Sequence, residues 1–230
     1  AHHDLGENVE GTQHAEQRFR ERVSGREPSP RGRIRREFRE AEEVILDVNE
    51  LAEGQPYCQV GSLGVSTNQH LLAYAVDFVG RRIYSIRFRD LRTGQDLPDR
   101  IDDVTANLAW ANDNQTLFYT RQDTETLRPF QVLRHALDSE PENDILVYQE
   151  DDETFRVGVG KTKSRAYLLI ASESTLSTEV RFAPADRPSE PFLLMEPRRR
   201  DHEYHVEHFE SHFYILTNHE AKNFRVMRTR

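Results

Sequence analysis

Four similar stretches of sequence decide the fold: LLAYAVD (Leu71–Asp77), LFYTRQD (Leu117–Asp123), YLLIASE (Tyr167–Glu173) and FYILTNH (Phe213–His219). Their last residues lie 46, 50 and 46 positions apart. Each stretch has the length and the apolar character of a strand, follows a polar turn and precedes further strand-like sequence. A period of about 45–50 residues with several strands in each period is typical of β-propeller blades.

The sequence between these stretches also has the pattern of strands. In the run 83–91, Ile86 and Phe88 alternate with Arg87 and Arg89, and this period of two indicates a half-buried strand. Further runs of this kind are Leu108–Ala111, Thr116–Arg121, Phe130–Leu137, Ile145–Tyr148, Ala166–Ala171, Glu179–Phe182, His212–Thr217 and Asn223–Arg228. We expect no amphipathic helix after residue 57.

Residues 39–230 are therefore predicted to form an all-β domain, a partial β-propeller of about four blades, each a four-stranded antiparallel sheet. A β-sandwich is the alternative, and it would explain the strands but not their regular spacing. Four units could close as a small ring or form an arc of a larger ring, and the pattern leaves both open.

The first 40 residues differ in composition, with nine arginines, no lysine and eight acidic residues. We predict that residues 1–38 are poorly ordered or loosely helical, because they offer no strong apolar face. The arginines of 31–39 could form an anion-binding arm, but interleaved glutamates favour a solvated segment of mixed charge.

Composition excludes several classes of protein. The net charge of −9 argues against nucleic acid as a partner. A single cysteine excludes an internal disulfide and a cysteine-based metal site, and we expect no cofactor. The longest apolar run has six residues, so no membrane helix is expected, and no secretory signal is visible. We therefore expect a cytoplasmic protein.

Several segments resemble the propeller of oligopeptidase B, within the prolyl oligopeptidase family of serine peptidases. They include the Trp110-Ala-Asn-Asp turn, the Val132–His135 strand and the run Asp201-His202-Glu203-Tyr204. The resemblance covers about residues 41–230, whereas the first 38 residues depart from the Tyr-rich strands of the family.

The resemblance implies a parent with a seven-bladed propeller that caps an α/β-hydrolase domain with a Ser-His-Asp triad. Such a parent cleaves short peptides after Arg or Lys, and its propeller keeps large folded proteins out of the catalytic cavity. The implied partners are this hydrolase domain and short peptides in transit. The implied catalytic half is outside this sequence.

No credible nucleophile is expected in the chain itself. The nearest match to Gly-x-Ser-x-Gly is 60–64, with Val60 in place of the first glycine, and we interpret Ser62 as a turn residue before a strand. The segment 158–162 resembles the end of a phosphate-binding loop but has Phe155 where that loop needs glycine, so we interpret it as a turn between strands.

Four histidines, His202, His205, His208 and His212, form the strongest candidate for a metal site. Their spacing does not match the His-Glu-x-x-His pattern, and we interpret them as polar strand and loop residues. We predict that Trp110 is buried in an inner strand. Cys58 is predicted to be a partly buried, inert thiol.

The repeat also predicts where a partner could dock. The loops after the four similar strands, 77–82, 122–128, 173–177 and 219–222, should lie on one face of the disc. This face, or the opposite one, is predicted to contact the hydrolase domain. Its candidate residues for inter-domain ion pairs are Asp77, Arg81, Arg82, Asp123 and Arg128. Solvated loop charges are the simpler alternative.

Three functions remain open from the sequence. The first is a non-catalytic gating domain of a serine oligopeptidase. The second is an independent propeller that binds a protein or peptide, and the third is an enzyme that uses the histidines to bind a metal.

Overall fold

The computed structural model describes residues 42–230, which fold as an all-β domain, as predicted. The strands are β1 (Gln59–Val65), β2 (Leu71–Asp77), β3 (Tyr84–Asp90), β4 (Gln95–Trp110), β5 (Thr116–Gln122), β6 (Pro129–Ala136), β7 (Ile145–Gln149), β8 (Arg156–Lys161), β9 (Tyr167–Glu173), β10 (Thr178–Pro184), β11 (Leu193–Glu196), β12 (Tyr204–Phe209), β13 (His212–Thr217) and β14 (Arg225–Thr229). Helical structure in these residues is limited to α3 (Val48–Ala52) and the 3-10 turn η1 (Pro141–Asn143). The prediction for residues 1–38 lies outside the described residues.

The strands pair antiparallel with their neighbours in sequence and form three sheets. Strands β1–β7 form one sheet, β8–β11 a second and β12–β14 a third. Within the first sheet, β4 serves two sets of strands: residues 95–104 pair with β3, and residues 104–110 pair with β5. The change falls next to Asp103, whose φ of 58° is left-handed. Aspartate tolerates this conformation better than a branched residue would.

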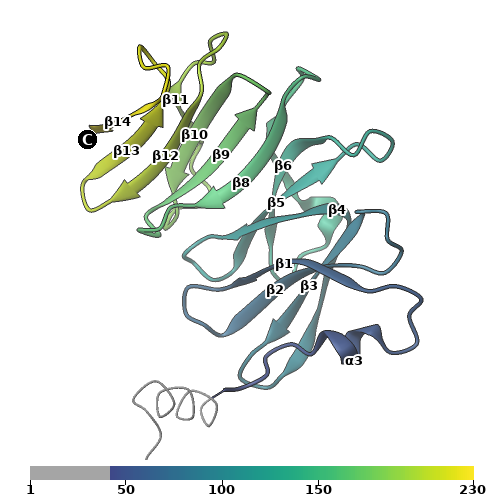
Figure 1. The fold of residues 1–230 in the computed structure, drawn as a ribbon. Helices are drawn as coiled ribbons and strands as arrows, with labels where there is room; N and C mark the ends of the chain where they lie inside the picture. Colours follow the sequence, from purple (N-terminus) through teal and green to yellow (C-terminus); the bar gives the residue numbers. More distant parts are fainter. Residues whose placement is uncertain (1–41) are drawn as a thin grey trace, which may run out of the picture. The chain divides into compact units, whose positions relative to one another are not determined.

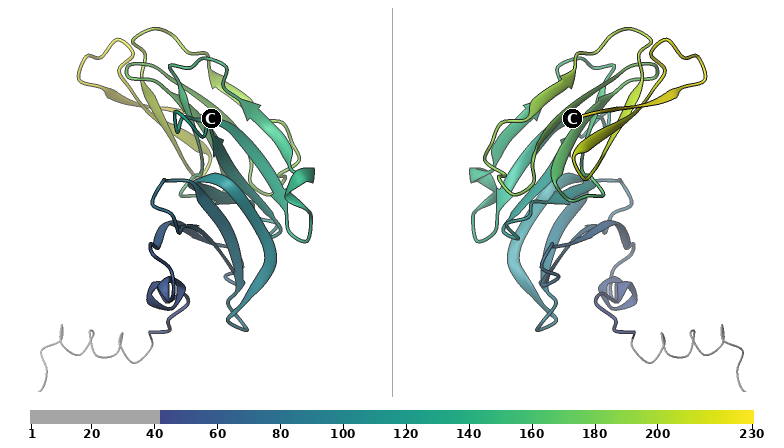
Figure 2. Two further views of the ribbon diagram at one scale, coloured as in Figure 1. Left: turned by 90° about the vertical axis from the view of Figure 1, so that its right-hand side faces the viewer. Right: turned by 90° about the vertical axis from the view of Figure 1, so that its left-hand side faces the viewer.

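The structure therefore consists of four repeats of similar design. Repeat 1 is β1–β3 with residues 95–103 of β4, repeat 2 is residues 104–110 of β4 with β5–β7, repeat 3 is β8–β11, and repeat 4 is β12–β14. The four similar stretches of sequence lie on β2, β5, β9 and β13, the second strand of each repeat. Figure 1 shows the repeats following one another from β1–β3 to β12–β14. In the two side views of Figure 2, α3 and the C-terminal end lie at opposite ends of this succession.

Two segments that the sequence predicted to be turns lie inside strands. Ser62 lies inside β1, next to a bulge between Val60 and Ser62, and is not a turn residue. Gly158 and Gly160 lie inside β8 and are not part of a turn, because they pair in register with Ala171 and Leu169 of β9.

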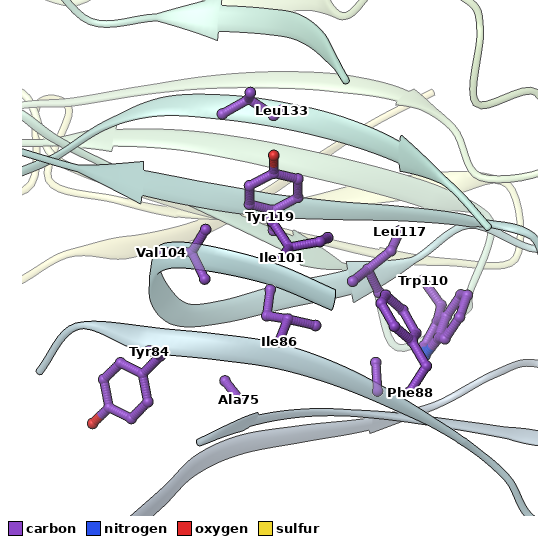
Figure 3. Packing of buried hydrophobic residues seen from close by; sticks show 11 residues of the cluster. Ala75, Tyr84, Ile86, Phe88, Ile101, Val104, Trp110, Leu117, Tyr119 and Leu133 are labelled. Carbon is purple, nitrogen blue, oxygen red and sulfur yellow. The ribbon is translucent and has the colours of Figure 1, made fainter. Parts of the chain in front are cut away.

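The first apolar cluster lies between repeats 1 and 2. Ala73, Ala75, Ile86 and Phe88 from repeat 1 contact residues of repeat 2, among them Trp110. Trp110 is 3% exposed, as predicted, and its ring meets that of Phe88 edge to face at 5.8 Å. Figure 3 shows Phe88, Trp110 and Leu117 gathered at one end of this cluster.

Strand β5 is buried on both faces. Leu117 and Tyr119 point into the first cluster, whereas Phe118 points into a second cluster with Leu168 and Ile170 of repeat 3. The aromatic side chains of Tyr167, Phe182 and Phe213 continue the packing between repeats 3 and 4. Each repeat therefore buries apolar surface against the next, which is how stacked repeats acquire a continuous core.

Hydrogen bonds from side chains fix the repeats in register. Trp110 Nε1 donates to the carbonyl of Gly64 in β1 at 2.9 Å. Asn107 of β4 pairs with both backbone groups of Val159 in β8, accepting at 2.7 Å and donating at 2.9 Å. These contacts satisfy backbone groups on β1 and β8, which are edge strands of their sheets.

One buried histidine of repeat 2 is held between two carboxylates, Asp144 of the same repeat and Asp99 of repeat 1. His135 has no exposed side-chain surface and lies 2.8 Å from Asp144 Oδ1 and 3.4 Å from Asp99 Oδ1. Tyr119 donates to the second oxygen of Asp144 at 2.8 Å, and the ring of Phe88 stacks on the imidazole. Burial works against the charged imidazole, but hydrogen bonds and attraction from the two aspartates prevail and raise the pKa of His135 above 6.5.

A first prediction concerns Gly61, which faces repeat 2. A Cβ atom there would lie 2.5 Å from the Tyr84 ring and 2.7 Å from Ala106 Cβ. Gly61→Ala should therefore lower the free energy of unfolding by about 1–3 kcal/mol, measured by urea denaturation. Gly160→Ala is the matched control, because a Cβ there meets nothing within 4 Å. Equal stabilities of the two variants would contradict the close packing of β1.

A second prediction concerns pH. Because the folded pKa of His135 is raised, its stabilising effect is present below about pH 6.5 and is lost as the pH rises through the folded pKa. The difference in unfolding free energy between the native chain and His135→Gln should therefore shrink from pH 5.5 to 8.5. Parallel stability curves for the two proteins over this range would show that His135 carries no such charge.

Candidate functional site

The loops that follow β2, β5 and β9, with the segment that joins β7 to β8, form the candidate site. Hydrogen bonds connect neighbouring loops: Gln122 donates to the carbonyl of Arg82 at 2.6 Å. Arg156 of β8 donates to the carbonyl of Leu127 at 3.4 Å, and Arg128 bonds to the carbonyls of the β7–β8 segment. We call this set the loop face. It confirms that the loops 77–82 and 122–128 lie together.

Asp77 and Asp123 shape their own loops. Asp77 is 1% exposed, and its carboxylate accepts from the backbone N–H groups of Val79, Gly80 and Arg82, each at 2.8 Å. Asp123 similarly accepts from the N–H of Thr126 at 2.7 Å and from its hydroxyl at 2.9 Å. Each carboxylate therefore supplies a hydrogen-bond acceptor for loop N–H groups that would otherwise have no partner in the backbone.

These contacts also keep both carboxylates charged. Burial alone would raise the pKa of Asp77, but the backbone N–H groups around it hold that pKa below its usual value of 3.8. Hydrogen bonds from Thr126 lower the pKa of Asp123 in the same way. A carboxylate engaged in this way has little capacity left for a partner domain.

The three arginines of the candidate set differ in their surroundings. Arg128 points inward and donates to the carbonyls of Phe155 at 3.0 Å, and of Glu150 and Asp152 at 3.3 Å. Arg81 and Arg82 are exposed. Within residues 42–230 their side chains make no hydrogen bond or ion pair, so these two are the members best placed to contact a partner. The inter-domain role of all five residues stays a prediction.

The loop face also contains a charged cluster that the sequence analysis did not identify. Arg198, which follows β11, contacts Glu150 at 2.5 Å and Glu179 of β10 at 3.2 Å. Its guanidinium lies over the ring of Phe155, 4.0 Å from the centroid. Tyr148 donates to Glu150 at 2.9 Å. These residues are 19 to 50 positions from Arg198, so no local motif could have revealed the cluster.

The cluster joins repeats 2 and 3 in a place with little water. Glu150 and Glu179 have side chains that are 4% and 7% exposed. Burial would raise the pKa of each, but the Arg198 guanidinium holds both below the usual value of 4.5. The two carboxylates in turn raise the pKa of Arg198. All three groups are therefore ionised at neutral pH.

The predicted histidine group divides into separate local contacts. His208 is buried beside Tyr167 and Phe213, and its Nδ1 lies 2.9 Å from Ser164 Oγ. His202 contacts Thr217 Oγ1 at 3.1 Å, His212 contacts Ser211, and His205 is exposed. In the described part of the chain, no three His, Cys, Asp or Glu side chains are arranged to hold a metal ion.

Two further observations bear on the sequence predictions. Cys58 is partly buried, as predicted. No helix within residues 42–230 has the length and apolar character needed to span a membrane.

The comparisons with known proteins agree with this architecture. The family model described as prolyl oligopeptidase, N-terminal beta-propeller domain, matches residues 10–230. This chain belongs to the prolyl oligopeptidase family. The match begins inside the arginine-rich segment, so the likeness to the family extends further toward the N-terminus than residue 41.

Two curated members of the family show how much of a whole protein the chain represents. Dipeptidyl aminopeptidase BI of Pseudoxanthomonas mexicana is 43% identical over 187 residues, which are 81% of this chain and 26% of that protein. Protease 2 of Moraxella lacunata is 38% identical over 189 residues, 81% of this chain and 27% of that protein. The chain therefore spans about a quarter of the length of these relatives.

Solved structures of the family have the same fold. Oligopeptidase B from Leishmania major superposes with a TM-score of 0.77 at 29% identity, over 89% of this chain and 28% of that one. Oligopeptidase B from Trypanosoma brucei, in a closed form with covalently bound antipain, superposes with a TM-score of 0.74 at 29% identity, over 81% of this chain and 26% of that one.

A third prediction tests the charged cluster. Arg198→Ala would leave Glu150 and Glu179 buried without their shared cation, so we expect the unfolding free energy to fall by about 2–4 kcal/mol. Arg200→Ala is the control, because its side chain is 94% exposed, and it should change stability by no more than about 0.5 kcal/mol. Urea denaturation measures both. If Arg198→Ala has the same free energy of unfolding as the native chain, the cluster does not stabilise the contact between repeats 2 and 3.

Proposed function

We propose that this chain is the non-catalytic propeller portion of a serine oligopeptidase that cleaves short peptides after Arg or Lys. The observation that carries the proposal is the match of almost the whole chain to the family's propeller domain, at 43% and 38% identity to two peptidases. The four repeats would be blades of a larger propeller, of seven blades if the parent follows the family. The preference for basic residues rests on the likeness to oligopeptidase B.

The propeller would restrict access to the catalytic cavity of its parent. A stack of repeats held together by apolar clusters and a buried ion pair suits this role, because such a stack would keep its shape at the entrance to a cavity. Its partners would be the hydrolase domain of the same parent and the peptides that pass. We also propose a cytoplasmic location.

The experiment that tests the proposal compares two proteins. The present chain alone should hydrolyse no peptide with a basic residue, with or without added zinc. The same chain extended through a following hydrolase region should cleave such peptides and should be labelled by a serine-directed fluorophosphonate. An extended protein that binds peptides but never cleaves them would favour an independent binding module. Release of dipeptides from the amino terminus would instead favour the activity named for the relative from Pseudoxanthomonas mexicana.

A fourth prediction addresses the docking face. Charge reversal of the two exposed arginines, Arg81→Glu with Arg82→Glu, should change kcat/KM of the extended protein by about two- to fivefold, equivalent to ~0.4–1 kcal/mol. Arg165→Glu, an exposed residue on the turn between β8 and β9, is the control for the opposite set of loops. Unchanged kinetics for the double variant would exclude Arg81 and Arg82 from docking. An effect of Arg165→Glu alone would place the docking surface on that opposite set of loops.

A further inference from the structure

Two glycines in β8 have no explanation in the packing of the chain. Gly158 and Gly160 lie two residues apart and so share one face of the strand. A Cβ on Gly160 would meet nothing within 4 Å, and one on Gly158 would meet only Asn107 Oδ1 at 3.8 Å. Glycine in a strand interior weakens the strand, and often marks a place where another backbone or a ligand approaches closely.

Repeat 1 has a glycine at the equivalent position, Gly64, and there a side chain of the next repeat occupies the space above it. In repeat 1, Gly64 pairs with Ala73 of β2, and in repeat 3, Gly160 pairs with Leu169 of β9, the equivalent register position. A Cβ on Gly64 would lie 2.8 Å from Leu108 of the next repeat. The space that Leu108 fills over Gly64 is therefore vacant over Gly160.

The vacancy arises because repeat 4 packs on β10 and, through His208 and Phe213, on Tyr167 at the start of β9, and leaves the Gly160 position uncovered. Strand β12 lies against β10, and Tyr204 bonds through its hydroxyl to the N–H of Val180 and the carbonyl of Glu196. The half of the sheet made by β8 and β9 lies beside a groove of about 660 Å³. This volume falls within the range of about 300–1,000 Å³ typical of ligand sites.

Small and apolar residues of two paired strands line the middle of the groove. Gly158, Gly160, Leu169 and Ala171 come from paired positions on the same face of β8 and β9, and all four are partly accessible. At one end lie Arg156 and Glu173, with Ser174 and Thr175 of the loop after β9. This end belongs to the loop face, so the groove can be reached from there.

The charged end favours a peptide with a basic side chain. Arg156 and Glu173 are cross-strand partners, yet they form no ion pair. Arg156 makes a weak hydrogen bond to the carbonyl of Leu127 at 3.4 Å, whereas Glu173 is exposed and has no ion-pair partner among residues 42–230. A carboxylate at the rim of an apolar groove attracts an arginine or lysine of an incoming chain.

We propose that this groove binds a short extended peptide, with its backbone over Gly158 and Gly160 and a basic side chain beside Glu173. This inference rests on the proposed function for the class of ligand, and adds a binding site on the propeller itself.

The test uses the 230-residue chain and a fluorescein-labelled Ala-Ala-Arg-Ala-Ala peptide in fluorescence anisotropy. Gly160→Val fills the groove and should raise the Kd about tenfold or more. Leu63→Phe is the control, because it adds bulk to an exposed position on β1 outside the groove, and it should leave the Kd within about twofold. Absence of binding to the native chain, or equal affinity of Gly160→Val, would overturn the site.

Two further measurements protect the test from a folding artefact. Glu173→Gln changes no volume and should weaken the arginine peptide about fivefold, while a citrulline analogue, which has no charge, binds both proteins equally. Thermal unfolding of Gly160→Val should match that of the native chain. If Gly160→Val is destabilised as Gly61→Ala is, then the chain itself packs on this face and the groove is not a ligand site.

The outcome is separable from that of the proposed function. If peptide binding depends on Gly160 but the extended protein has no peptidase activity, the groove is supported as a binding site and the proposed oligopeptidase function is contradicted. If the native and Gly160→Val proteins cleave basic peptides with the same KM, the proposed oligopeptidase function is supported and the groove is contradicted as a binding site.

Discussion

The structure depends on one constraint, which is that the apolar faces of a strand inside a repeat need a neighbouring repeat to cover them. Strand β5 shows it most directly, because Leu117 and Tyr119 need repeat 1 whereas Phe118 needs repeat 3. A single four-stranded sheet with two apolar faces would leave both faces in water, at a cost of roughly 25 cal/mol for each Å² of apolar surface. Repeats therefore stabilise one another, and none is expected to fold alone.

Polar groups complete the contacts that apolar packing begins. At the loop face, Arg198 is shared by Glu150 and Glu179, which belong to different repeats. On the opposite set of turns, Asn112 accepts from Lys161 and donates to the carbonyl of Arg165, again between repeats 2 and 3. The apolar clusters have no strong directional preference, whereas these bonds do. They fix the rotation of one sheet on the next, which packing alone would leave looser.

The repeat was predictable from the sequence because its signal is apolar and local. Strand β2 was predicted with the bounds that the structure shows, since Leu71–Val76 is an unbroken apolar run. The first part of β4 was missed because it contains Asp96, Pro98 and Asp99, whose character is that of a loop. Gly158 was misread as a turn residue because glycine is depleted in strands. The Arg198 cluster could not be predicted from the sequence, because Glu150 after β7, Glu179 of β10 and Arg198 after β11 come together only in the folded chain.

Comparison of the repeats separates residues that serve the fold from residues that can serve a partner. Asp77 and Asp123 lie 46 positions apart at the same point of the pattern and perform the same task, accepting backbone N–H groups of the loop that follows. When a residue recurs at the same position in successive repeats, its role in the fold of each repeat is enough to explain it. Recognition needs asymmetry, because a partner contacts particular repeats. The positions most informative about function are therefore those that break the repeat, such as Arg81 and Arg82 beside the repeated loop geometry, and the two glycines of β8 that no neighbouring repeat requires.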